Sequence, residues 1–161
     1  MNLVGNLPAE VRQKAQLKTQ PTWVSPMLAT LTGERFSREN WIFERKLDGE
    51  RCLAFKRGNK VQLLSRNHKS IADKYPEIVE AIAKQKPSNI IVDGEIVAFD
   101  GEATSFQLLQ NRMQTHDPSA NLQKIAPVFY YLFDLLYSLL GFNTPPLAAD
   151  IVEWIREHLC T

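Results

Sequence analysis

The fold of this chain is decided by two apolar runs and the turn between them, Arg51-Cys52-Leu53-Ala54-Phe55-Lys56, Arg57-Gly58-Asn59-Lys60 and Val61-Gln62-Leu63-Leu64-Ser65. Both runs have the length and composition of short strands. The residues that join them include glycine and asparagine, which tight hairpin turns favour. The stretch therefore predicts an antiparallel β-hairpin.

Further strands and helices are expected on both sides of this hairpin. The run 128–137 is almost entirely aromatic or aliphatic, which predicts a central strand buried on both faces. Asp73 is placed to cap a helix. Strand patterns also cover 41–46, 89–92 and 95–99, the last before an Asp100-Gly101 turn, and helical patterns cover 8–18, 73–85, 105–113 and 148–159. Short strands with interspersed helices predict an α+β fold with a mainly antiparallel sheet and flanking helices.

Composition excludes several classes of protein. The 161 residues are 44% hydrophobic and 23% charged, which is ordinary globular usage and excludes wholesale disorder. A net charge of +1 excludes a strongly basic, DNA-coating protein. We expect neither a membrane span nor a secretory signal. Cys52 and Cys160 form no disulfide framework, so a cytoplasmic location is predicted. The three histidines show no metal-ligand spacing.

The small net charge hides a gradient along the chain. Residues 41–74 contain nine Lys or Arg and four Asp or Glu, whereas residues 88–161 contain three and nine. A basic segment on a neutral chain is typical of a phosphate-facing surface. It is equally compatible with a solvated face of the sheet, and charge alone does not decide between the two.

The residues with the clearest chemical pattern surround Lys46, in the segment Phe43-Glu44-Arg45-Lys46-Leu47-Asp48-Gly49-Glu50-Arg51. If this segment is a strand, its period of two directs Glu44, Lys46 and Asp48 to one side. A lysine amine is nucleophilic when deprotonated, and the neighbouring arginines favour that form. The alternative is a surface strand of alternating charge that ends in a glycine turn.

Four ordered motifs in this sequence resemble those of covalent nucleotidyltransferases, the group of ATP-dependent DNA ligases, RNA ligases and capping enzymes. They are Lys46-Leu47-Asp48-Gly49-Glu50-Arg51, Ser65-Arg66-Asn67, Val92-Asp93-Gly94-Glu95 and Tyr131-Leu132-Phe133-Asp134-Leu135-Leu136-Tyr137. The flanking runs Pro26-Met27-Leu28-Ala29 and Ser105–Gln110 are similar to the ligase domain of bacterial non-homologous end-joining ligases. The resemblance implies the N-terminal part of an ATP-grasp-like adenylation domain.

The resemblance also implies roles for individual residues. Lys46 would attack the α-phosphate of ATP, release pyrophosphate and hold AMP as a phosphoramidate. Glu44 would accept a hydrogen bond from the adenine amino group and so distinguish ATP from GTP. Phe133 would stack on the adenine ring, although its place in an apolar run is equally typical of a core residue.

The remaining motif residues would bind the ribose, the phosphates and the metal. Arg51 and Arg66 would contact ribose and phosphates, and Glu95 would contact the ribose or a water bound to Mg²⁺. Asp48 and Gly49 would support the site, with Asp48 orienting Lys46 or the turn. Mg²⁺ would neutralise the triphosphate. AMP would then pass to the 5′-phosphate of nicked or broken double-stranded DNA, in repair or recombination.

The resemblance predicts three segments: a polar leader at 1–20, a partial adenylation domain at 21–137, and a divergent tail at 138–161 with an amphipathic helix. Two later motifs of the family and its oligonucleotide-binding barrel have no match in this sequence. Two function classes therefore stay open. The chain is either a ligase homologue with a working nucleophile, or a non-catalytic remnant. The remnant would bind nucleotide or DNA, self-associate, or need a partner chain.

Overall fold

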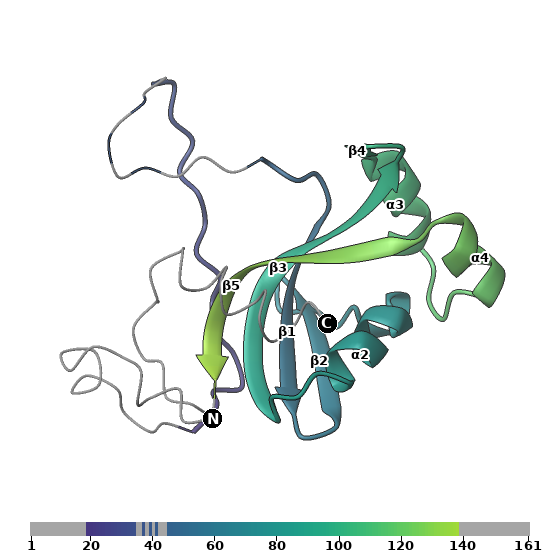
Figure 1. Cartoon of the computed structure of the whole chain (residues 1–161), viewed down its shortest axis with the longest axis horizontal. Coiled ribbons are helices and arrows are strands. Elements are labelled where there is room, and N and C mark those ends of the chain that lie inside the picture. Colours follow the sequence, from purple (N-terminus) through teal and green to yellow (C-terminus); the bar gives the residue numbers. More distant parts are fainter. Residues whose placement is uncertain (1–18, 35–36, 38, 40, 42–44, 139–161) are drawn as a thin grey trace.

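The computed structural model describes residues 19–34, 37, 39, 41 and 45–138 (Figure 1). The strands are β1 (Glu50–Arg57), β2 (Lys60–Ser65), β3 (Asn89–Asp100), β4 (Ala103–Thr104) and β5 (Val128–Ser138). The helices are a 3₁₀ turn η2 (Ala72–Lys74), α2 (Pro76–Ala83), α3 (Phe106–Met113) and α4 (Ala120–Ile125). No helix among these residues is long and apolar enough to cross a membrane.

The five strands form one antiparallel sheet with β3 at its centre. β1 pairs with β2 on one side and with β3 on the other, and β3 also pairs with β4 and β5. The predicted hairpin is confirmed, because Arg57 pairs with Lys60 and Gly58 has a φ of 57° at the turn. The expected α+β class with a mainly antiparallel sheet is therefore confirmed.

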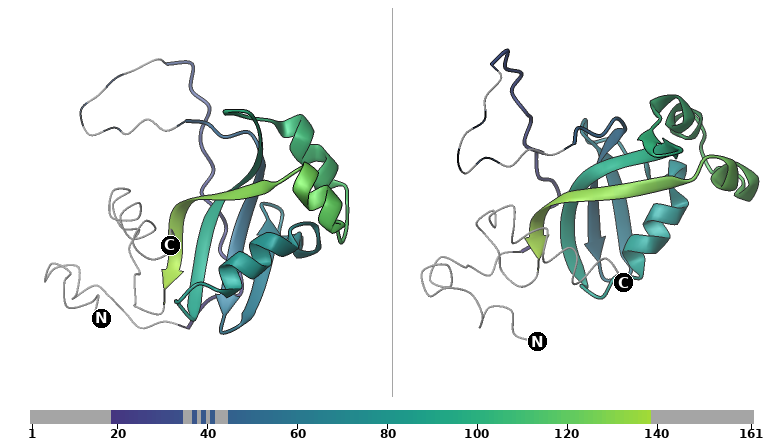
Figure 2. Two further views of the ribbon diagram at one scale, coloured as in Figure 1. Left: turned by 45° about the vertical axis from the view of Figure 1, so that its right-hand side comes forward. Right: turned by 45° about the horizontal axis from the view of Figure 1, so that its top comes forward.

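The two faces of the sheet are covered differently. On one face, alternate residues of β1 such as Cys52 and Ala54 join Ile78 and Ile82 of α2 and Leu109 of α3 in the main core. On the other face, a smaller cluster of Leu53, Phe55, Leu64 and Ile91 packs against Trp23 and Val24 of the N-terminal segment. Figures 1 and 2 show the helices on one side of the sheet and residues 19–34 on the other.

β3 corrects one expectation from the sequence. The runs 89–92 and 95–99 were expected to be separate strands, but they are one strand of twelve residues. Asp93 and Gly94 lie inside this strand, where Gly94 pairs with Cys52 of β1 and with Leu132 of β5. A Cβ at Gly94 would stand 2.6 Å from Tyr130 Cε2, so glycine here permits a close approach of β5.

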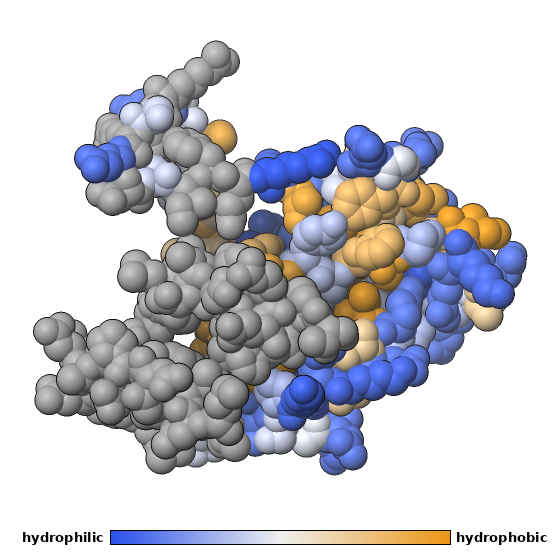
Figure 3. Space-filling view, in the orientation of Figure 1, coloured by the Kyte–Doolittle hydropathy of each residue, from blue (hydrophilic) through white to orange (hydrophobic). Residues whose placement is uncertain are grey.

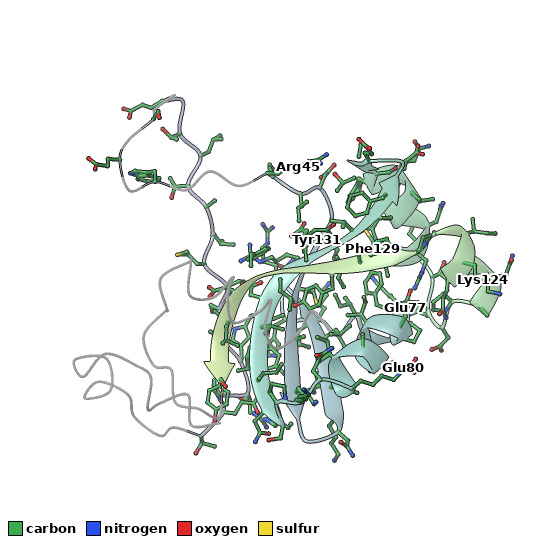
Figure 4. The ribbon with its side chains drawn as sticks, in the orientation of Figure 1. Arg45, Glu77, Glu80, Lys124, Phe129 and Tyr131 are labelled. Carbon is green, nitrogen blue, oxygen red and sulfur yellow. The ribbon has the colours of Figure 1, made fainter. Side chains whose placement is uncertain are left out.

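β5 corrects a second expectation. It is a strand, as predicted, but among the described residues it pairs with β3 alone and is not buried on both faces. Phe129 and Tyr131 are 48% and 45% exposed, and both rings approach Phe99 of β3 within 6 Å, centroid to centroid. Figure 3 shows the hydrophobic surface in this region, and Figure 4 shows both side chains on β5.

Three smaller expectations also differ from the structure. Trp41 and residues 45–48 have no strand geometry, so the predicted strand at 41–46 is wrong for its described part. The helix expected over 73–85 is instead a 3₁₀ turn, η2, followed by α2, because Pro76 begins the α-helix. The Asp73 side chain contacts His116 and does not cap a helix. Ser105 caps α3, which matches the helix expected at 105–113. The helices expected at 8–18 and 148–159 lie outside the described residues.

Candidate active site

The Lys46 turn, residues 46–49, leads into β1 and lies against β3. Lys46 and Asp48 are exposed, and Gly49 is partly buried. A Cβ at Gly49 would overlap the carbonyl oxygen of Ile96 and stand 2.8 Å from Val97 Cγ1. The same Cβ would stand 3.0 Å from Cγ of Glu95, so the Glu95 side chain lies directly against the turn. The glycine therefore lets the turn approach β3 more closely than a residue with a side chain could.

Arg51 is fixed by a buried carboxylate on the neighbouring strand. Its Nε and Nη2 donate to Asp93 Oδ1 and Oδ2 at 2.6 and 2.7 Å, and Asp93 is 1% exposed. Nη2 also lies 3.4 Å from the carbonyl oxygen of Met27. The hydrogen bonding that Arg51 donates to Asp93 raises the pKa of Arg51, against the opposing effect of burial. A bidentate pair of this kind sets the direction of the guanidinium as well as its charge.

Phe133 lies beside this guanidinium at an irregularity in β5. Asp93 pairs with Asp134 and the next residue, Gly94, pairs with Leu132, so Phe133 is an extra residue in the strand. Such a bulge redirects a side chain and is common near binding sites. The Arg51 Cζ atom lies 4.4 Å from the centroid of the Phe133 ring, within cation–π range.

Glu95 pairs with Arg51 across β1 and β3, so both side chains point to the same face of the sheet. Burial raises the pKa of Glu95, while the charge of Arg51, the N–H of Gly49 and the charge of Lys46 act in the opposite direction. The carboxylate is therefore half-buried among two cations and one amide. It can accept a hydrogen bond or neutralise a cation close to Lys46.

Asp93 and Asp134, paired across β3 and β5, were not assigned roles from the sequence. Burial raises the pKa of the Asp134 carboxyl, and the charge of Asp93 contributes in the same direction. The available signal was an acidic residue inside an otherwise apolar strand, which is unusual unless the charge has a partner. For Asp93, that partner is Arg51.

The acidic groups here do not form a metal site by themselves. Within the described part of the chain, no group of three or more His, Cys, Asp or Glu side chains could hold a metal ion. Mg²⁺ commonly binds one or two carboxylates together with the phosphates of a substrate. Glu95 fits that pattern as a single carboxylate, because Asp93 is already paired with Arg51.

The structure thus brings together Lys46, Gly49, Arg51, Glu95 and Phe133 at one end of β1. Arg66 is exposed and directly follows Ser65, which pairs with Cys52 of β1, so it lies at the same end of the sheet. Asp48 is exposed in the Lys46 turn. Glu44 lies outside the described residues.

Residues 26–153 match a protein family described as ATP dependent DNA ligase domain. The chain belongs to this family. The matched region includes every site residue named above and continues beyond Tyr137, where the recognised motifs end. The DNA ligase fold also agrees with the α+β architecture and antiparallel sheet.

Named DNA ligases are among the similar proteins. DNA ligase 2 of Thermofilum pendens is 40% identical over 126 residues, which is 71% of this chain and 20% of that protein. The DNA ligase of Hyperthermus butylicus is 43% identical over 124 residues, or 73% of this chain and 20% of its own length. The chain therefore matches about a fifth of the length of these relatives.

A solved DNA ligase structure shares the fold. The ligase domain of M. tuberculosis LigD superposes with a TM-score of 0.53 at 26% identity, covering 71% of this chain and 35% of that one. A mycobacterial DNA ligase D described as complexed with ATP and MES gives a TM-score of 0.50, also at 26% identity and with the same coverage.

Proposed function

We propose that this chain carries the nucleophile of an ATP-dependent DNA ligase of the bacterial end-joining type, and that Lys46 forms a covalent bond to AMP. The observation that carries the proposal is the convergence of Lys46, Arg51, Glu95 and Phe133 at one end of the sheet. These residues come from three strands and one turn. Together they offer an amine, a fixed cation, a carboxylate and an aromatic ring.

In the proposed reaction, the Lys46 amine attacks the α-phosphate of ATP. A bond forms between Nζ and phosphorus, the bond to the pyrophosphate oxygen breaks, and the amine releases a proton. The exposed position of Lys46 leaves it accessible to a nucleotide. Glu95 interacts electrostatically with Lys46, so its carboxylate lies beside the reacting amine.

The adenosine would lie against β5. The ring of Phe133 stacks on adenine, and Arg51 supports the ring from one side at 4.4 Å. Glu44, six residues before the start of β1 in the sequence, accepts a hydrogen bond from the adenine amino group and so selects ATP over GTP. The mycobacterial structure described as complexed with ATP supports this assignment of the nucleotide.

The phosphates would lie toward the cations. Arg51, held by Asp93, and Arg66, next to the end of β2, provide positive charge without rearrangement during the reaction. Mg²⁺, when bound, would neutralise the triphosphate, and Glu95 would be the carboxylate that holds it. Asp48 orients the Lys46 turn.

The subsequent substrate, nicked or broken double-stranded DNA, is proposed from the names of the relatives. Transfer of AMP to a DNA 5′-phosphate, a role in repair or recombination and a cytoplasmic location belong to this proposal. The second candidate is a non-catalytic chain that binds nucleotide or needs a partner chain.

The proposal is tested by incubating the chain with α-labelled ATP and Mg²⁺ and isolating the protein after denaturation. Label should remain attached, and added pyrophosphate should remove it by reversing the reaction. Lys46→Ala should retain no label, whereas Lys60→Ala, at an exposed lysine of β2, should label like the wild type. Equal labelling from GTP would contradict the role of Glu44. A folded wild-type chain without label would support the non-catalytic candidate.

A further inference from the structure

We propose that Tyr75 and Glu50 are positioning residues that hold the Lys46 turn from the helix side of the sheet. The inference rests on the proposed function, since it concerns how Lys46 is presented to the nucleotide. Tyr75, between η2 and α2, is fully buried, and its hydroxyl donates to Glu50 Oε2 at 2.7 Å. Glu50 directly follows Gly49 and begins β1.

The Tyr75 ring is itself held by a buried arginine of α3. Arg112 is fully buried and lies with its Cζ atom 5.9 Å from the ring centroid. Its Nη2 donates to the carbonyl oxygen of Lys74 at 2.9 Å and pairs with Glu77 at 2.6 Å. Its Nη1 donates to the carbonyl oxygen of Ala126 at 3.0 Å. Through Arg112 of α3, these contacts link the Tyr75 ring to η2, to α2 and to the C-terminal end of α4.

The Lys46 turn is thereby held from both faces of the sheet. On the open face, the Glu95 side chain lies against Gly49, with Cγ 3.0 Å from the place that a Cβ on Gly49 would take. On the helix face, the carboxylate of the next residue, Glu50, accepts the hydroxyl of Tyr75. Packing of Glu95 against Gly49 and the hydrogen bond of Tyr75 to Glu50 therefore restrict two consecutive residues from opposite faces.

The hydroxyl is suited to this role. Burial, and then the hydrogen bond to Glu50, raise the pKa of Tyr75, so the phenol stays protonated and remains a donor. Glu50 itself is partly exposed and would otherwise be hydrated and mobile. The buried hydroxyl of Tyr75 therefore restricts the carboxylate of Glu50, the residue that directly follows the Lys46 turn.

The test is Tyr75→Phe, which removes one hydroxyl and keeps the ring against Arg112. Tyr130→Phe is the matched control, because Tyr130 donates from the same face to the carbonyl oxygen of Cys52 at 2.8 Å, away from the turn. Two quantities are measured: the rate of AMP transfer to Lys46 at saturating ATP, and hydrogen exchange of the Gly49 amide by NMR.

We expect Tyr75→Phe to slow AMP transfer roughly ten-fold, the order of effect that small displacements of reacting groups produce. The KM for ATP should change by less than about two-fold, because the contacts to nucleotide are intact. Exchange of the Gly49 amide should accelerate. Glu50→Gln keeps an oxygen that accepts the hydroxyl and should retain near wild-type rate and exchange.

Tyr130→Phe should destabilise the fold without changing either quantity. Equal effects of the two tyrosine variants, or an unchanged rate and exchange in Tyr75→Phe, would overturn the inference. If Tyr75→Phe does not fold, Glu50→Ala is compared with Tyr130→Phe in its place, because it removes the same hydrogen bond by changing the residue on the strand. If the wild type forms no covalent AMP, the proposed function fails, and exchange of the Gly49 amide alone decides whether Tyr75 holds the turn.

Discussion

The pair of Arg51 and Asp93 makes the sharpest prediction about stability. Asp93→Asn keeps the size of the side chain and removes its charge. The carboxylate now accepts from both Nε and Nη2 at 2.6 and 2.7 Å. An asparagine can accept one of these hydrogen bonds, and its amide nitrogen must face the other donor. The variant therefore leaves a cation with an incomplete partner.

The magnitude follows from the burial of the two side chains. Asp93 is 1% exposed and the Arg51 side chain 26% exposed. Removing one partner of a buried pair costs about 3–5 kcal/mol. Arg51 can regain some water through its exposed part, so we expect the lower end, a loss of about 3 kcal/mol in the free energy of unfolding.

Urea unfolding followed by near-ultraviolet circular dichroism measures this loss, provided that the slope with urea is unchanged. The matched control is Glu80→Gln, since Glu80 pairs with Lys84 at 2.7 Å but the two side chains are 67% and 71% exposed. Figure 4 shows Glu80 on the outer side of α2. The control should show no resolvable change. Equal losses in both variants would refute the reasoning that burial makes the Asp93 pair strong.

Three further predictions concern the glycine turn, the buried thiol and the half-buried carboxyl. Gly49→Ala should destabilise the fold by at least about 1 kcal/mol because its Cβ would overlap β3, whereas Gly33→Ala, which meets nothing within 4 Å, should not; equal unfolding midpoints would contradict this. In a Cys160→Ser variant, Cys52 should resist thiol reagents at pH 8 until urea unfolds the chain, because it is fully buried and burial raises its pKa; fast native-state labelling would disprove it. The pKa of Glu95 is higher in the folded chain than its ordinary value of 4.5, so the native state keeps the Glu95 proton to a higher pH than the unfolded state. The free energy of unfolding should therefore fall as pH rises from about 4.5 through the folded pKa and then level off. Urea unfolding at a series of pH values should show this fall in the free energy of unfolding of the wild type and a smaller fall in Glu95→Gln. A rise with pH would contradict a raised pKa of Glu95.

Local features of the fold were predictable from the sequence. The β1–β2 hairpin follows from glycine and asparagine between two strand-forming runs, and the start of α3 follows from the capping Ser105. Long-range features were not. Asp93-Gly94 resembles a turn when taken alone, and it becomes the middle of β3 because Gly94 admits the backbone of β5.

The site was predictable as a set of residue types but not as a set of contacts. The motifs name Lys46, Arg51, Glu95 and Phe133. The pairing of Arg51 with Asp93, 42 residues apart, depends on the register of β1 and β3. Likewise, the Tyr75 hydroxyl meets Glu50 because η2 and α2 pack over that end of the sheet. The nearly continuous apolar run at 128–137 also led to the wrong prediction of a strand buried on both faces, since its aromatic side chains are compatible with an exposed face.

The most direct test of the account is the intact mass of the chain after incubation with ATP and Mg²⁺. The account predicts that the wild type gains the mass of one AMP, that the adduct maps to the peptide carrying Lys46, and that Lys46→Ala gains nothing. A folded wild-type chain that stays at its original mass, or an adduct on any other lysine, would contradict it.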